Sequence, residues 1–249
     1  MKGYKVLFPR GLAFVCMAFV SAALLLVSCS KPNQTLVRQL ALLQSAPKSS
    51  VPAKESITQL EREVAKYQRD VNRAFEATRN LGHAEEMLGL QYLSHKMYGM
   101  ALKSFQQALQ IYPSDPALFY VAGLCQGEMA KIEVDSQVQR TLFEQAASYY
   151  KNALGLDPNY QDALYALSIL DVYELNKPVE AQPILQHLLS LDAKNTNAMF
   201  LLARVEAGNG QAEEAAALYD RIIKTSSSQE VRTKAEAAKR SILESAYGK

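Results

Sequence analysis

The chain has no tryptophan, only three cysteines and only three histidines in 249 residues. The histidines, His83, His95 and His187, lie far apart, and none has a second ligand at the spacing that a metal site needs. The sequence also lacks a glycine-rich phosphate loop and the serine-centred turn of hydrolases. We therefore expect no catalytic residue, no metal site and no cofactor, which argues against an enzyme.

A large net charge of one sign is also missing. The chain carries 27 basic and 25 acidic side chains, and Lys2, Lys5 and Arg10 lie in a leader that has no acid. Without residues 1–28 the chain has 24 basic and 25 acidic side chains. No basic patch remains that would bind phosphates, so we expect no nucleic-acid partner.

The N-terminus has the pattern of a secretory signal, a basic segment followed by the apolar run Gly11–Val27. The run ends in Leu26-Val27-Ser28-Cys29, which resembles the lipobox of bacterial lipoproteins. The resemblance implies a signal peptide over residues 1–28, lipidation at Cys29 and a lipid anchor in the bacterial cell envelope. An uncleaved membrane span is the alternative, although the run is only marginally long for a bilayer.

The residues around the cysteines bear on location and redox chemistry. Ser30, and not an aspartate, follows the lipidated cysteine; by resemblance to the sorting rule of some bacteria, this points to the outer membrane, with the protein facing the periplasm. Cys16 leaves with the signal, so Cys125 is the only free thiol of the mature chain and no intramolecular disulfide forms. Because Cys125 lies in an apolar segment, we expect it to be buried and unreactive.

Residues 29–54, beginning with the lipidated cysteine, are predicted to be a tether, because the stretch 45–52 contains two prolines and three serines. Residues 55–81 are predicted to form an amphipathic helix. Apolar and small residues recur there at steps of three and four: Ile57, Leu60, Val64, Tyr67, Val71, Ala74, Thr78 and Leu81. We expect this seam to pack against the chain's own first repeat. A coiled-coil dimer, which would make the protein a homo-oligomer, is the alternative.

A repeated pattern begins at residue 82. The first copy has large and small residues at fixed positions: Leu88, Gly89, Tyr92, Ala101, Phe105, Ala108 and Pro113. This spacing resembles the tetratricopeptide repeat, in which about 34 residues form two antiparallel helices. The resemblance implies an all-α fold, a right-handed α–α superhelical solenoid.

The repeats extend over residues 82–228 as about four helix pairs. The later copies match with decreasing fidelity, at positions that include Gly123, Ala146, Tyr150, Ala153, Ser168, Ala181, Leu185, Leu188, Ala203, Ala215, Tyr219 and Ile222, with Gly210 in a turn. Residues 229–249 carry one apolar stripe, Val231, Ala235, Ala238 and Ile242, on an otherwise polar helix. This is typical of the helix that caps an open solenoid end.

The second copy is longer than the first. Gly89 and Ala101 are 12 residues apart, whereas Gly123 and Ala146 are 23 apart, so 11 residues are inserted. Eleven residues make about three helical turns, which lengthens a hairpin while keeping its faces nearly in phase. We expect residues 128–140 to form a polar projecting tip, with a loose surface loop as the alternative.

Two local features complete the prediction of helices. Gly89 and Gly123 fall in mid-helix, where each costs about 1 kcal/mol relative to alanine, which suggests that another backbone approaches them. Asp115 followed by Pro116 is the pattern of a capping residue before the first helical position.

The family resemblance also predicts a partner-binding groove, because the first helix of each repeat lines the concave face. The fifth residue of that helix points into the groove, and the next groove residue follows one turn later. The eight positions here are Glu86, Leu90, Tyr120, Leu124, Tyr165, Ile169, Phe200 and Arg204. The alternative is that the helix over residues 56–81, or another protomer, covers this stripe and makes it part of the core.

Chaperone-binding members of the family hold a C-terminal carboxylate with Lys, Asn and Arg in this groove. The corresponding positions here include Glu86, Leu90, Leu124 and Asp162, so that clamp is absent. The sequence therefore predicts a membrane-anchored scaffold that binds a protein or peptide partner in the envelope. A structural homo-oligomeric subunit is the second hypothesis.

Overall fold

The computed structural model describes Arg38, Ala41 and residues 54–248. The predicted signal peptide, the lipidation site Cys29 and nearly all of the tether lie outside the described residues. The chain divides into two units, residues 1–69 and 70–249. None of the described helices combines the length and the apolar character that a bilayer span requires.

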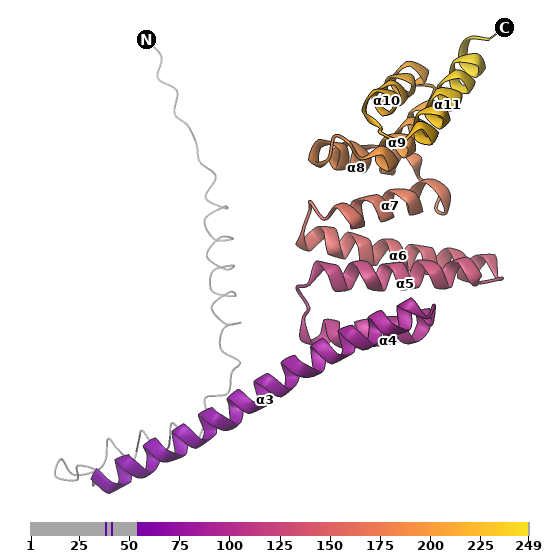
Figure 1. Cartoon of the computed structure of the whole chain (residues 1–249). Coiled ribbons are helices and arrows are strands. Elements are labelled where there is room, and N and C mark those ends of the chain that lie inside the picture. Colours follow the sequence, from indigo (N-terminus) through magenta and orange to yellow (C-terminus); the bar gives the residue numbers. More distant parts are fainter. Residues whose placement is uncertain (1–37, 39–40, 42–53, 249) are drawn as a thin grey trace, which may run out of the picture. The chain divides into compact units, whose positions relative to one another are not determined.

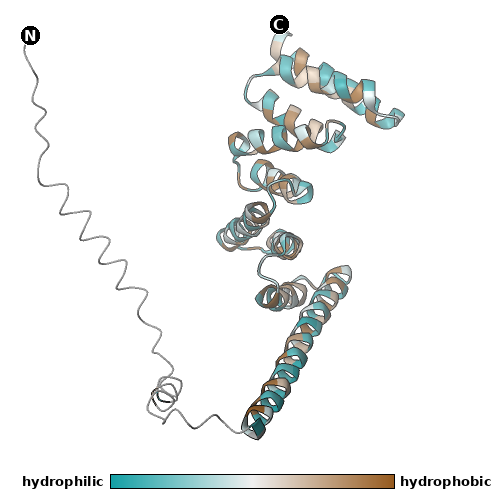
Figure 2. Ribbon diagram, turned by 90° about the vertical axis from the view of Figure 1, so that its left-hand side faces the viewer, coloured by the Kyte–Doolittle hydropathy of each residue, from teal (hydrophilic) through white to brown (hydrophobic). Residues whose placement is uncertain are grey.

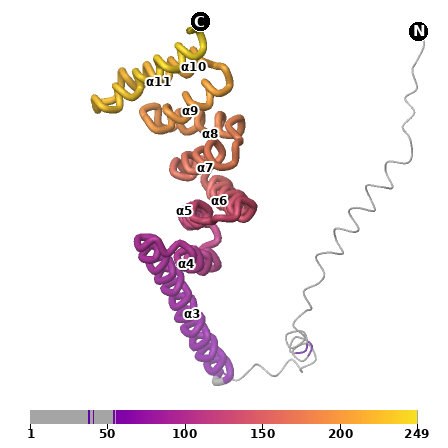
Figure 3. The backbone as a smooth tube through the Cα atoms, turned by 90° about the vertical axis from the view of Figure 1, so that its right-hand side faces the viewer, coloured from indigo at the N-terminus to yellow at the C-terminus, as the bar shows by residue number. Residues whose placement is uncertain are grey.

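The described elements are α-helices, which confirms the predicted fold class. In chain order they are α3 (Lys54–Ser94), α4 (Tyr98–Ile111), α5 (Pro116–Ile132), α6 (Ser136–Leu156), α7 (Gln161–Tyr173), α8 (Pro178–Leu191), α9 (Thr196–Gly208), α10 (Ala212–Thr225) and α11 (Gln229–Tyr247). Within the second unit, α4 to α11 stack one on the next, with the chain running back and forth across the stack (Figures 1 and 3).

The predicted helix over residues 55–81 and the first helix of the first repeat are one element, because α3 continues through residues 81 and 82 without a break. A single glycine, Gly82, weakens a helix but does not end it. Contact with the next repeat helix is close at this point: the Tyr112 hydroxyl donates to the Arg79 carbonyl oxygen at 2.7 Å. A Cβ on Gly82 would lie 2.6 Å from the Tyr112 ring. The predicted boundary between residues 81 and 82 is therefore not a helix end. It lies where α3 comes into contact with Tyr112 at the end of α4.

The apolar seam of α3 is exposed where it lies in the second unit, at Val71 and Leu81, so for this part the prediction that it packs against the first repeat is wrong. Six of its side chains are between 44% and 63% exposed: Ile57, Leu60, Val64, Tyr67, Val71 and Leu81. Figure 2 shows brown residues recurring among teal ones along this helix. The reason is length, since α4 has 14 residues and α3 has 41. One short helix covers only about a third of such a long one.

Most signature positions of the repeats form the core, as predicted, but Leu88 of the first repeat is 42% exposed. Positions with no exposed surface include Ala101, Phe105, Ala108, Ala122, Ala146, Ala153, Ser168, Ala181, Leu185, Leu188, Ala203, Ala215 and Ile222. Except for Ala153 and Ser168, these residues belong to three clusters that follow the stack from α4 to α11. Each cluster joins neighbouring helix pairs, which is how repeat solenoids are stabilised.

The two mid-helix glycines are contact positions, but the approaching group is an aromatic ring. A Cβ on Gly89 would lie 2.6 Å from Cε1 of Phe105, and a Cβ on Gly123 would lie 2.7 Å from Cε1 of Tyr150. The atoms nearest to such a Cβ therefore belong to side chains, whereas the sequence suggested a close backbone. Phe105 and Tyr150 occupy the same position in successive repeats, so the ring of the second helix fills the space that glycine leaves on the first.

The predicted helix start and turn are confirmed. The side chain of Asp115 accepts a hydrogen bond from the Ala117 N–H at 2.8 Å, with Pro116 at the first helical position. Between α9 and α10, Gly210 has a φ of +79°, a left-handed conformation that favours glycine.

The insertion in the second repeat is helical, which confirms the first of its two predicted forms. The helices α5 and α6 have 17 and 21 residues, whereas α7 and α8 have 13 and 14. Asp135 caps α6 by accepting from the N–H groups of Gln137 and Val138. The tip is less polar than predicted, because Ile132 is 72% and Val134 is 95% exposed.

The last helix caps the stack as predicted. Ala235 of α11 is fully buried, and Val231, Ala238 and Ile242 pack against the same cluster. The other faces of α11 are polar, and Lys239 bonds to both carboxylate oxygens of Asp220 on α10.

Candidate functional site

The first helices of the repeats line two pockets on one face of the second unit. The middle pocket, about 260 Å³, lies between α5, α6 and α7. The C-terminal pocket, about 610 Å³, is lined by α7, α9, α10 and α11. Tyr165 and Ile169 of α7 line both pockets, so the two pockets adjoin along α7, and we call them together the groove.

The structure brings six of the eight predicted groove residues together in these pockets. Tyr120 and Leu124 line the middle pocket, Phe200 and Arg204 line the C-terminal pocket, and the two α7 residues belong to both. The repeat period therefore placed these six side chains on one face.

The two predicted residues on α3 line neither of these pockets. The carboxylate of Glu86 lies 3.6 Å from the imidazole of His83 one turn earlier on the same helix. Leu90 is 41% exposed. The groove that the pockets define begins at α5.

Aromatic rings form the wall of the middle pocket. Tyr120 meets Tyr160 edge to face with ring centroids 5.6 Å apart, and its ring centroid lies 6.0 Å from that of Tyr150. Burial, with a smaller contribution from the Asp162 carboxylate, raises the pKa of Tyr120. Its hydroxyl therefore stays protonated at neutral pH and can donate a hydrogen bond.

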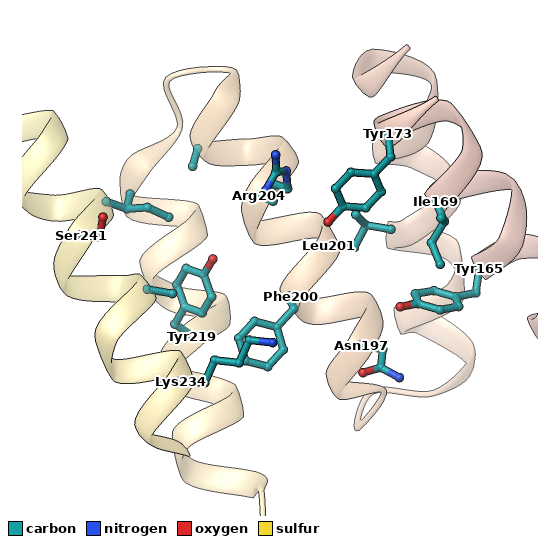
Figure 4. A pocket seen from close by; sticks show the side chains of 13 residues that line it. Tyr165, Ile169, Tyr173, Asn197, Phe200, Leu201, Arg204, Tyr219, Lys234 and Ser241 are labelled. Carbon is teal, nitrogen blue, oxygen red and sulfur yellow. The ribbon is translucent and has the colours of Figure 1, made fainter. Parts of the chain in front are cut away.

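The C-terminal pocket combines aromatic rings with two cations (Figure 4). Phe200 and Tyr219 meet at 5.8 Å between ring centroids. The Lys234 ammonium lies 5.4 Å from the centroid of the Phe200 ring, and the Arg204 guanidinium lies 5.0 Å from that of Tyr173. Such stacking orients a cation over a ring while its other donors remain available.

Most of the groove positions are half-buried, which distinguishes them from the core. Tyr120, Tyr165 and Phe200 have intermediate exposure. Tyr150 and Tyr219, on the second helices behind them, are only 6% and 5% exposed. The first three rings therefore present one face to the pockets and pack with the other.

Sequence reasoning missed several pocket residues, above all Tyr173, Lys234 and Glu174. The sequence did contain a signal for Lys234. It follows Phe200 by 34 residues, which is the repeat period, so the capping helix continues the inner face of the repeats. Tyr173 is one further turn along α7 from the predicted Ile169.

The remaining candidate chemical groups are dispersed or buried. No group of three or more potential metal ligands occurs in the part of the chain that the structure describes. Cys125 is fully buried, and burial raises the pKa of its thiol to about 12, so it is a core residue as predicted.

Comparison with known proteins agrees with the fold. The tetratricopeptide repeat family model matches residues 173–233. Photosystem I assembly protein Ycf3 of Dioscorea elephantipes is 39% identical over 80 residues, which are 30% of this chain and 46% of that protein. Ycf3 of Sorghum bicolor is 35% identical over 91 residues, which are 35% and 53% of the two chains. The chain therefore spans about half the length of these curated relatives.

Solved structures share the architecture at low sequence identity. A tetratricopeptide repeat protein from Parabacteroides merdae superposes with a TM-score of 0.58 at 17% identity, over 68% of this chain and 61% of that one. A thermophilic tetratricopeptide protein of Thermus thermophilus gives 0.54 at 18%, over 75% and 98%. Together these comparisons show that the chain has the fold of tetratricopeptide-repeat solenoids and that residues 173–233 resemble the tetratricopeptide repeat family.

Proposed function

We propose that this protein is a lipid-anchored adaptor of the bacterial envelope that holds a protein segment in the groove of α5, α7, α9 and α11. The observation that carries the proposal is the pair of adjoining pockets, which are lined by most of the residues expected to contact a partner. Half-buried aromatic residues in such a groove are the usual anchors of a bound segment. The Ycf3 relatives are named as assembly proteins, and an adaptor role agrees with that use of the repeats.

A photo-crosslinking residue tests the groove in intact cells. Placed at Phe200, it should give a discrete adduct with one partner. The same residue at Lys224, which is exposed on α10 and lines neither groove pocket, is the control. Identical adducts from both positions would contradict binding in the groove.

The lipid anchor is tested separately at Cys29. Cells fed a labelled fatty acid should label the wild type at its mature N-terminus, and Cys29→Ser should abolish both the label and the cleavage after Ser28. A Cys29→Ser protein that is still labelled and cleaved would overturn the lipoprotein assignment. Membrane fractionation of the labelled protein then tests the outer-membrane location.

A second candidate function, a homo-oligomeric structural subunit, is favoured by the exposed seam of α3. Its first heptad positions are β-branched, Ile57, Val64, Val71 and Thr78, and leucine stands at the first and last of the intervening positions, Leu60 and Leu81. This combination is typical of parallel two-stranded coiled coils.

Sedimentation of the purified full chain distinguishes the two functions. A subunit that assembles through α3 should form a concentration-dependent dimer that Leu60→Asp with Val71→Asp dissociates. Gln59→Asp with Asn72→Asp adds the same charge outside the seam and should leave the dimer intact. A wild type that stays monomeric at all concentrations would exclude the oligomeric function.

A further inference from the structure

The two halves of the groove carry opposite charge. The C-terminal pocket has two charged residues, Arg204 and Lys234, and both are basic. The middle pocket has three acids, Glu128, Asp162 and Glu174, and one base, Lys131. The charge of the lining residues therefore changes from negative in the middle pocket to positive in the C-terminal pocket. Tyr165 and Ile169, which line both pockets, lie between the two ends.

The charges at the two ends are available to a partner. In the middle pocket, Lys131 pairs with Glu128 on the same helix, which leaves the exposed carboxylates of Asp162 and Glu174. Across the described residues, neither of these acids forms an ion pair, and neither do Arg204 and Lys234.

The wall between the charged ends is apolar. Tyr165 and Ile169 are half-buried on α7 and face both pockets. The ring of Phe200 continues this surface into the C-terminal pocket, where the Lys234 side chain lies across it (Figure 4). An apolar or aromatic side chain placed here would remove these surfaces from water, whereas charged groups at its two sides would meet opposite charges.

We propose that the groove selects a peptide segment with an apolar or aromatic centre, acidic side chains on one flank and basic side chains on the other. The acidic flank lies against Arg204 and Lys234, and the basic flank lies against Asp162 and Glu174. This deepens the proposed function and rests on it, since a segment must first bind in the groove. Charge opposition then fixes which end of the segment lies at which end of the groove.

A display library tests the selection with the purified full chain in detergent. Its peptides have a fixed phenylalanine at the centre and randomised flanks, so that side chains supply the charges. The wild type should enrich peptides with acids on one flank and bases on the other. Arg204→Glu with Lys234→Glu should enrich bases on both flanks, and Asp162→Lys with Glu174→Lys should enrich acids on both flanks.

A matched control separates the groove from net charge. Lys224→Glu with Arg240→Glu makes the same change in charge outside both pockets and should keep the wild-type preference. An enriched peptide should bind roughly tenfold more weakly to the Arg204→Glu, Lys234→Glu variant, and the difference should shrink at high salt. If that variant does not fold, Arg204→Gln with Lys234→Gln should lose the preference for the acidic flank.

The outcomes separate this proposal from the function on which it rests. Enrichment of apolar peptides without opposite flanking charges would overturn the charge selection and leave groove binding standing. Absence of any enrichment would overturn both. Self-association of the wild type that only Arg204→Glu with Lys234→Glu abolishes would show that a second copy fills the groove, and it would overturn the peptide proposal.

Discussion

At the scale of single residues, the structure shows which neighbouring side chain requires a glycine at each of the two mid-helix positions. Phe105 and Tyr150 lie against Gly89 and Gly123, so an aromatic ring on one helix is matched by a glycine on the other. Such a pair leaves no room for a larger residue at the glycine, and this makes the contact testable by substitution.

We expect Gly89→Leu to destabilise the protein by about 1–3 kcal/mol, because the new side chain must displace the Phe105 ring. For a chain of this size the melting temperature should fall by roughly 2–10 °C. Gly99→Leu is the control, since a Cβ at Gly99 has no neighbour within 4 Å. Equal melting temperatures for the two variants would contradict the contact at Gly89.

A buried acid in α9 makes stability depend on pH. Glu206 is 6% exposed, and its Oε2 has no hydrogen-bond partner among the described residues. Burial, and then the carboxylate of Glu214, raises the pKa of Glu206. The folded state therefore holds this proton more tightly than the unfolded state, and the ionised carboxylate destabilises the fold at neutral pH.

Replacing this acid by its amide should stabilise the protein at neutral pH. We expect Glu206→Gln to melt about 2 °C or more above the wild type at pH 7. The difference should shrink as the pH falls through the raised pKa toward the ordinary range of glutamate, because the wild type then becomes protonated. Glu214→Gln, at an exposed position, should change the melting temperature less. A difference that grows on acidification would contradict the assignment.

At the scale of elements, helix ends and lengths follow from capping groups and packing. The long hairpin of α5 and α6 projects its tip beyond its neighbours. The cap Asp135, a backbone hydrogen bond from the Glu133 N–H to the Ala130 carbonyl oxygen and a few side-chain hydrogen bonds hold the turn. Gln139, for example, donates to the carbonyl oxygen of Ala130 at 3.1 Å.

We expect Asp135→Ala to fray the first turn of α6 locally. The loss leaves two N–H groups without their acceptor and costs about 1 kcal/mol. Amide hydrogen exchange should quicken at residues 137–141, whereas protection near Tyr150 should stay as in the wild type. Uniformly faster exchange over the whole of α6 would show that the tip is not an independent unit.

The sequence predicted most elements because periodicity and capping are local. It placed the solenoid, the elongated hairpin, the capping helix and the starts marked by Asp115 and Gly210. It missed the continuity of α3, since no local signal says where a helix stops contacting a neighbour. It also predicted the exposed seam of α3 to be packed, because an apolar stripe looks the same whether or not something covers it.

At the scale of the whole molecule, stacking of the repeats brings residues that are one repeat period apart in the sequence onto one surface. It identified Tyr120, Tyr165 and Phe200 because equivalent positions in stacked repeats fall on one face. It did not identify Glu174 or Lys234 as groove charges. Charged residues on helices are usually solvated, and only the pockets show which of them lie beside the rings.

Replacing Tyr120, Tyr165 and Phe200 by alanine together tests whether these rings serve binding or stability. Groove anchors should give a variant that loses the crosslinked partner, with a melting temperature lowered by only a few degrees. If the rings are core residues, each truncation should cost about 3–5 kcal/mol and the variant should unfold. A stable variant that still captures the partner would exclude the rings as anchors.

The capping helix carries a consequence for the length of the protein. Because α11 contributes Lys234 and Ala238 to the inner face, it occupies the place of a first helix in a further repeat. A helix pair inserted between α10 and α11 should therefore be accepted if its two apolar faces match those neighbours. The groove would then become longer by one unit, with Lys234 carried outward on α11 while Arg204 stays in place on α9. The distance between the acidic residues and Lys234 is thus set by the number of repeats.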